Sequence, residues 1–110
     1  MFSLNGQNIA VTRGDTLRLK LEIINEESGE LYIPSDGDIV EFGVKAKYAE
    51  EECLIKKVMP NDTLILHIAP EDTKPLNFGS YVYDCQVTFA NGDVKTFISK
   101  KKFKITEEVV

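Results

Sequence analysis

The 110-residue sequence contains no tryptophan, one histidine and two cysteines, and it has no long hydrophobic run. A membrane-spanning helix needs about 20 consecutive, mostly apolar residues, so the sequence predicts no such helix and no membrane partner. The first residues, MFSLNGQNIAV, lack the basic and apolar regions of a secretory signal. No secretory signal is therefore evident, and we expect synthesis in the cytoplasm.

The two cysteines are too few for a disulfide scaffold. Cys53 and Cys85 also lack the close spacing of a metal knuckle or a redox pair. Because an unpaired cysteine behaves as a small apolar residue, we expect both thiols to be free and mostly buried.

The charge balance is acidic, with 13 basic and 18 acidic residues and a net charge of -5. Nucleic acids and anionic membranes repel an acidic surface, so neither is an expected partner. The hydrophobic fraction of 43% and the charged fraction of 28% are typical of an ordinary globular chain. The length fits one domain that spans residues 1–110.

Apolar and polar residues alternate along most of the chain, with the period of two that is typical of a half-buried strand. The pattern predicts strands over residues 8–12, 16–24, 39–47, 53–59, 62–69, 80–89 and 95–105. The expected inward residues are Leu17, Leu19, Leu21 and Ile23; Val40, Phe42, Val44 and Ala46; Leu64, Leu66 and Ile68; and Tyr81, Tyr83, Cys85, Val87 and Phe89.

Turn-forming residues separate these strands. Asn91-Gly92 is a dipeptide that tolerates two positive φ angles, so it predicts a tight hairpin between the last two long strands. In APEDTKPLNFG we expect one helical turn, because Pro70 suits a first helical position and Pro75 prevents much continuation. Together these features predict an all-β fold, an antiparallel Ig-like β-sandwich of about seven strands with one short helical turn.

One segment resembles an immunoglobulin domain. In Tyr83-Asp84-Cys85 a tyrosine precedes a cysteine by two residues, as in the second-cysteine strand of that fold. The chain has no tryptophan, and the strand at residues 16–24 carries no partner cysteine. We therefore predict the architecture of an Ig-like sandwich without membership of the immunoglobulin lineage.

Arg13-Gly14-Asp15 is a tripeptide that many integrins recognise. Receptor recognition usually needs it at the tip of a projecting loop, whereas here it lies between two apolar strand segments. Glycine permits a sharp backbone, and an aspartate can accept hydrogen bonds from the amides that follow it. We interpret the tripeptide as a turn.

No residues form a catalytic, cofactor-binding or metal-binding pattern in the sequence. His67 is the only histidine, and its neighbours belong to the expected core, so we expect a solvated side chain. Ser80 and Ser99 have no paired base. The sequence therefore predicts a protein that is not an enzyme and needs no cofactor.

Four aspartates in turns, Asp36, Asp38, Asp62 and Asp72, carry the hard oxygen ligands that calcium prefers. The twelve-residue calcium-loop pattern is absent. We expect these aspartates to stabilise turns.

The densest basic stretch is Lys100-Lys101-Lys102 with Lys104. A nucleic-acid patch would need interleaved aromatic residues, and this stretch has few. Lysines on an outer strand discourage edge-to-edge pairing. We therefore expect residues 95–105 to form an exposed edge strand, with residues 8–12 as the other exposed edge.

Taken in order, these segments resemble small phage and prophage structural proteins of Gram-positive hosts, similar to the N-terminal domain of baseplate upper proteins. The matching stretches are VTRGDTLRLKLEI, GDIVEFGVK, LIKKVM, APEDTKPLNFGSYVYDCQVTFANGDVKTFI and KFKITEEV. The resemblance implies a virion structural module in the tail, in the baseplate or at a fibre attachment. It also implies other phage structural proteins as partners and a homo-oligomer. The alternative is a carbohydrate- or receptor-binding adhesin module, which would present an aromatic platform to sugar rings.

Overall fold

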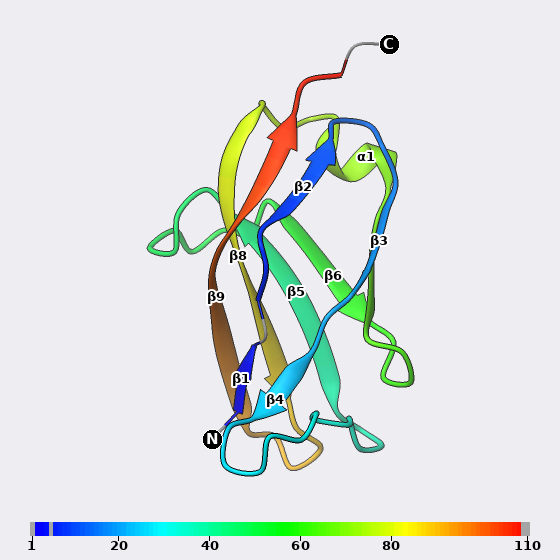
Figure 1. The fold of residues 1–110 in the computed structure, drawn as a ribbon, viewed down its shortest axis with the longest axis vertical. Helices are drawn as coiled ribbons and strands as arrows, with labels where there is room; N and C mark the ends of the chain where they lie inside the picture. The colour runs from blue at the N-terminus through cyan, green and yellow to red at the C-terminus, as the bar shows by residue number, and fades with distance from the viewer. Residues whose placement is uncertain (1, 5, 109–110) are drawn as a thin grey trace.

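The computed structural model describes residues 2–4 and 6–108, and strands dominate it (Figure 1). The all-β prediction is confirmed, as is the short helical turn. The elements are β1 (Phe2–Leu4), β2 (Ile9–Thr12), β3 (Leu17–Lys20), β4 (Ile23–Asn25), β5 (Ile39–Lys45), β6 (Ile55–Met59), β7 (Ile65–Ile68), α1 (Pro70–Thr73), β8 (Gly79–Thr88) and β9 (Val94–Thr106).

The largest sheet has five strands in the order β2-β9-β8-β5-β6. Two smaller antiparallel pairs, β1-β4 and β3-β7, complete the strand pairing, and Figure 1 shows β1, β3 and β4 in front of the large sheet. Because β2 runs parallel to β9, the large sheet is mixed, and the prediction of a purely antiparallel arrangement is wrong. A parallel partner needs a long connection, and here almost the whole chain lies between the two strands.

The core lies between the large sheet and the smaller pairs, and it largely follows the predicted inward faces. Val40, Phe42 and Val44 of β5 are fully buried, as are Leu66 and Ile68 of β7. Leu21, Ile23, Leu64, Tyr83, Cys85 and Val87 are also buried, whereas Leu17, Leu19, Tyr81 and Phe89 are half-buried around the core. Ala46 is exposed because β5 ends at Lys45, one residue before it.

The predicted strand over residues 16–24 is divided in two. β3 pairs with β7, and β4 pairs with β1, so the chain changes its partner between Lys20 and Ile23. At the junction the Leu21 amide donates to the Leu64 carbonyl at 3.1 Å. The inward alternation continues through the break, which is why the sequence alone predicts one strand.

The hairpin at Asn91-Gly92 is confirmed, but its predicted turn geometry is wrong. Only Gly92 has a positive φ, at 95°. The Gly92 amide donates to the Phe89 carbonyl, and the Phe89 amide donates to the Asp93 carbonyl, both at 2.8 Å. This is a three-residue loop, in which a turn is followed by one left-handed glycine.

The predicted exposed edges are confirmed in part. β2 lies at one end of the large sheet, as expected for residues 8–12. The C-terminal part of β9, however, is held between β2 and β8: Phe103 pairs with Ile9 on one side and with Tyr81 on the other. The lysine-rich strand is therefore not an edge over residues 103–106, and β6 forms the second edge of this sheet.

Candidate functional site

Arg13-Gly14-Asp15 forms a turn, as predicted. The Asp15 amide donates to the Thr12 carbonyl at 2.9 Å, and Gly14 has a φ of 86°. The Arg13 guanidinium is bound to Glu108 through Nη2 at 2.8 Å and lies 4.6 Å from the centroid of the Phe78 ring. The arginine thus ties the β2–β3 turn to the last described residues of the chain.

Gly14→Ala is expected to destabilise the protein by about 1–2 kcal/mol, because an L-residue at this φ is strained. A new Cβ would also lie 3.3 Å from Lys74 Cε. Gly29→Ala is the matched control: its φ is 75°, but a Cβ there meets nothing within 4 Å. Denaturant unfolding should show that Gly14→Ala lowers the free energy of unfolding at least as much as Gly29→Ala does. A smaller loss would contradict this account of the turn.

His67 is exposed on β7, as predicted, and pairs in register with Arg18 of β3. Both side chains line an open hollow of about 360 Å³ with Lys57 and Ile65. Lys57 is already bound to Asp72 at 2.8 Å. Within the described residues, no group of three or more histidine, cysteine or acidic side chains could hold a metal ion.

The four aspartates have different roles. Asp36 and Asp62 are both exposed. Asp72 accepts a hydrogen bond from the Ala69 amide at 2.7 Å and so caps the N-terminus of α1. Asp38 is buried, and it joins three loops.

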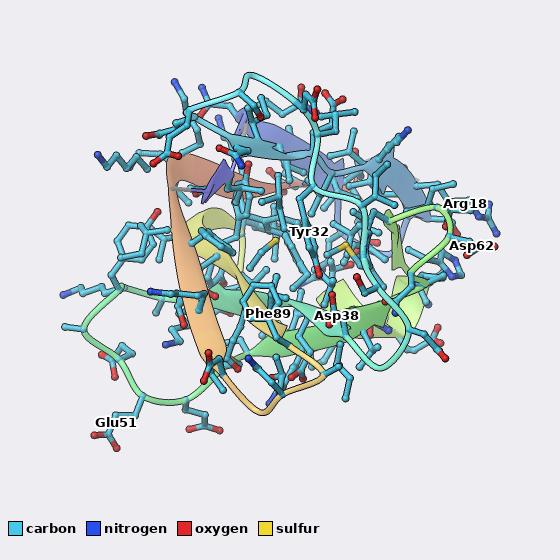
Figure 2. All side chains as sticks on the ribbon, turned by 90° about the horizontal axis from the view of Figure 1, so that it is seen from below. Arg18, Tyr32, Asp38, Glu51, Asp62 and Phe89 are labelled. Carbon is cyan, nitrogen blue, oxygen red and sulfur yellow. The ribbon has the colours of Figure 1, made fainter. Side chains whose placement is uncertain are left out.

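Asp38 accepts hydrogen bonds from the Tyr32 hydroxyl, from the Ser35 amide at 2.9 Å and from the Ala90 amide at 2.9 Å. Its carbonyl accepts from Asn61 Nδ2 at 2.7 Å. The Tyr32 hydrogen bond, followed by the Ser35 amide, lowers the pKa of the Asp38 carboxyl against the opposing effect of burial. Figure 2 shows Tyr32, Asp38 and Phe89 near the centre of this end of the molecule. Asp38 is therefore a structural clamp.

The cysteines are free, as predicted: Cys85 is buried and Cys53 is partly exposed. Burial, with a smaller contribution from the charge of Asp84, raises the pKa of the Cys85 thiol to about 12. Since the thiolate is the reactive form, Cys85 is expected to be inert in the folded protein.

A thiol-specific chromogenic reagent should therefore titrate one thiol in the native protein and two in the unfolded protein. Cys53→Ser should abolish the native reaction, whereas Cys85→Ala should leave it in place. A reducing agent should not change the melting temperature, since no disulfide links the two residues. Rapid reaction of both thiols under native conditions would contradict the predicted burial.

The lysine-rich segment lies at a β-bulge. Val82 pairs with Lys102 and Asp84 with Ile98, so residues 99–101 lie opposite Tyr83 alone. Lys100 has a φ of 58°, a left-handed conformation that costs a non-glycine residue about 1–2 kcal/mol. Bulges redirect side chains and are common beside functional sites.

Hydrogen bonds hold this bulge in place. The Lys101 amide donates to Ser99 Oγ at 3.0 Å, and the Lys100 amide donates to the Tyr48 hydroxyl at 3.1 Å. The Tyr48 hydroxyl also lies 3.2 Å from Ser99 Oγ. Ser99 and Tyr48 thus hold the backbone of the bulge together. The sequence does not indicate this contact, because 51 positions separate the two residues.

Tyr48 belongs to the β5–β6 loop, residues 46–54, which protrudes at the left in Figure 1. Near its other end, Cys53 Sγ lies over Gly43 of β5, where an added Cβ would be 3.1 Å from the sulfur. Asp84 and Lys45 line a second hollow together with Gly43 and Cys53. Burial raises the pKa of the Asp84 carboxyl, and the charge of Lys45 opposes this shift. The β5–β6 loop and the β9 bulge together form the candidate functional site.

No protein-family model matches this sequence, and no curated protein matches it. Among the described residues, no helix is long and apolar enough to cross a membrane.

Proposed function

We propose that this chain is a non-enzymatic structural module of a phage virion, acting in the tail, in the baseplate or at a fibre attachment. It acts through contacts with other phage structural proteins and as a homo-oligomer, and it is localised in the virion. The proposal starts from the ordered resemblance of the sequence segments to the N-terminal domain of baseplate upper proteins. It needs a surface suited to protein contacts.

The observation that supports it best is the outer face of the large sheet. Ile39, Val58, Val94 and Ile98 point away from the core, and each is at least 47% exposed. Strand alternation normally places polar residues on a solvated face. Here the aliphatic side chains alternate with polar ones, since Val58 pairs with Glu41 and Ile98 with Asp84. Exposed apolar residues among polar residues support a surface that binds other proteins.

The fold proposed for this role is an Ig-like sandwich. The order β9-β8-β5-β6 corresponds to the G-F-C-C′ strands of that fold, and the pairs β1-β4 and β3-β7 correspond to A-B and B-E. The Tyr81 hydroxyl donates to the Asn77 carbonyl at 2.6 Å, as in a tyrosine corner. Tyr83, the residue that the sequence suggested for comparison, instead donates to the Gln7 carbonyl.

The alternative, a carbohydrate- or receptor-binding adhesin, would be favoured by exposed aromatic rings gathered in one place. Of the exposed aromatics, Phe78 lies under Arg13 near the β2–β3 turn, and Tyr48 contacts Ser99 at the β9 bulge. These contacts place the two rings in different parts of the molecule. The virion module is therefore the function proposed.

Mass spectrometry of purified particles from the phage or induced prophage that encodes the chain tests this function. We expect the polypeptide to copurify with particles at a constant ratio to the major tail protein, including after a high-salt wash. A lysate of the same culture serves as the expression control. Absence from particles despite expression in the lysate would overturn the proposed function.

A further inference from the structure

Two clusters of opposite charge project from the candidate site. The β5–β6 loop carries Glu50, Glu51 and Glu52, and the β9 bulge carries Lys100 and Lys101, with Lys102 directly after it. All six side chains are exposed, and Figure 2 shows Glu51 far from the body of the molecule. In the described part of the chain none of the six takes part in an ion pair. Their charges are therefore available to a partner.

The two clusters lie next to each other on one side of the molecule. The Tyr48 hydroxyl, two residues before Glu50, contacts Ser99 Oγ and accepts from the Lys100 amide. Cys53, directly after Glu52, is packed over Gly43. Both ends of the acidic segment are thus fixed to the large sheet, so the clusters are held together before any partner binds, which lowers the ordering cost of association.

Apolar side chains accompany the charges. Ile98 immediately precedes the bulge and is 52% exposed, and the β5–β6 loop contributes Leu54 and Tyr48, which are 41% and 37% exposed. Apolar residues with charged residues around them are the usual composition of a protein interface, in which apolar area is buried at the centre and charges lie at the rim.

We propose that a second copy of this chain docks on this surface across a two-fold axis, with the acidic loop of each copy on the lysine bulge of the other. A partner of one charge sign would match one cluster and be repelled by the adjacent one. A second copy matches both, because one rotation makes the same contact twice. This inference rests on the proposed assembly role and names the surface that would carry the homo-oligomer.

Sedimentation equilibrium of the full chain, from about 10 µM to 1 mM in about 50 mM salt, should show a mass rising to twice the 12.4 kDa of one chain. Raising the salt to about 500 mM should weaken the dimer, since exposed charges are screened. A mass that stays at one chain throughout would overturn the proposal, and so would a mass that exceeds two chains.

Charge-reversal variants then locate the contact. Glu50→Lys/Glu51→Lys makes both clusters basic, and Lys101→Glu/Lys102→Glu makes both acidic, so each variant alone should dimerise at least ~10-fold more weakly. An equimolar mixture of the two should recover a heterodimer, because every contact is complementary again. A single chain carrying all four reversals should also dimerise.

The matched control is Glu26→Lys/Glu30→Lys, which changes the net charge by the same amount as Glu50→Lys/Glu51→Lys but lies in the exposed β4–β5 loop. It should dimerise like the original chain. Dimerisation unaffected by the loop and bulge variants, or no recovery on mixing, would overturn the proposal. These measurements need no phage particles, so their failure is distinct from absence of the chain in the virion.

Discussion

Phe42→Ala is expected to lower the free energy of unfolding by about 3 to 5 kcal/mol, the usual cost of removing a buried phenylalanine ring. Phe42 is fully buried on β5, with its ring centroid 5.4 Å from that of Tyr83 and 6.0 Å from that of Phe103. β5 is hydrogen-bonded to both β6 and β8, so the backbone is restrained from moving into the cavity. Urea unfolding of the purified chain measures the loss.

Ile39→Ala on the same strand is the matched control. Ile39 is 47% exposed and points to the outer face, so its truncation should cost less than about 1 kcal/mol. Equal losses for the two variants would mean that the inward face of β5 has been assigned wrongly. If the outer face were instead buried in a stable dimer, the cost of Ile39→Ala would rise with protein concentration.

Alternation in the sequence was enough to predict most of the core. β5, β7 and β8 are regular strands over their core-facing residues. The side chains that a period of two predicts to point inward are therefore the ones that point inward in the structure. Leu66 shows this well, since it is predicted inward and is fully buried. Leu19, which pairs with it, is also predicted inward but is only half-buried. Alternation gives the direction of a side chain but not how many neighbours cover it.

The pairing of strands could not be read from the same pattern. The parallel contact between β2 and β9 joins segments from opposite parts of the chain, and alternation carries no information about partners. The break between β3 and β4 is hidden for the same reason. Turn residues predicted the β8–β9 hairpin because its closure is local, with only five residues between the strands.

The candidate site was predicted only as a lysine run. A bulge displaces residues 99–101 from the regular period, so the lysines point in directions that an ideal strand would not give them. The contact of Tyr48 with Ser99 depends on the conformation of a loop that lacks regular structure. Neither feature has a sequence signature, whereas the turn at Gly14 has one, because few residues other than glycine adopt its backbone conformation.

Asp38→Asn is expected to give the second-largest loss of stability, measured as a fall of several degrees in the melting temperature at neutral pH. The Asp38 carboxylate accepts hydrogen bonds from the Tyr32 hydroxyl and from the Ser35 and Ala90 amides. Asp38 is only 7% exposed. An amide keeps the shape but replaces one acceptor oxygen with a donor, which leaves buried partners unpaired. Asp36→Asn, two residues away and exposed, should leave the melting temperature nearly unchanged.

The loss of stability in Asp38→Asn should depend on pH. The Tyr32 hydrogen bond and the Ser35 amide hold the pKa of Asp38 below its unfolded value of about 3.9. The stability that the carboxylate contributes is therefore complete above that value, and it is lost as the pH falls through the lower pKa of the folded state. The melting temperatures of the original chain and Asp38→Asn should differ most near pH 7 and converge below about pH 4. Tyr32→Phe, which removes the hydrogen bond with the largest effect, should reduce the difference only in part. A difference in melting temperature between the original chain and Asp38→Asn that stays constant from neutral to acidic pH would show that the charge of Asp38 does not stabilise the clamp.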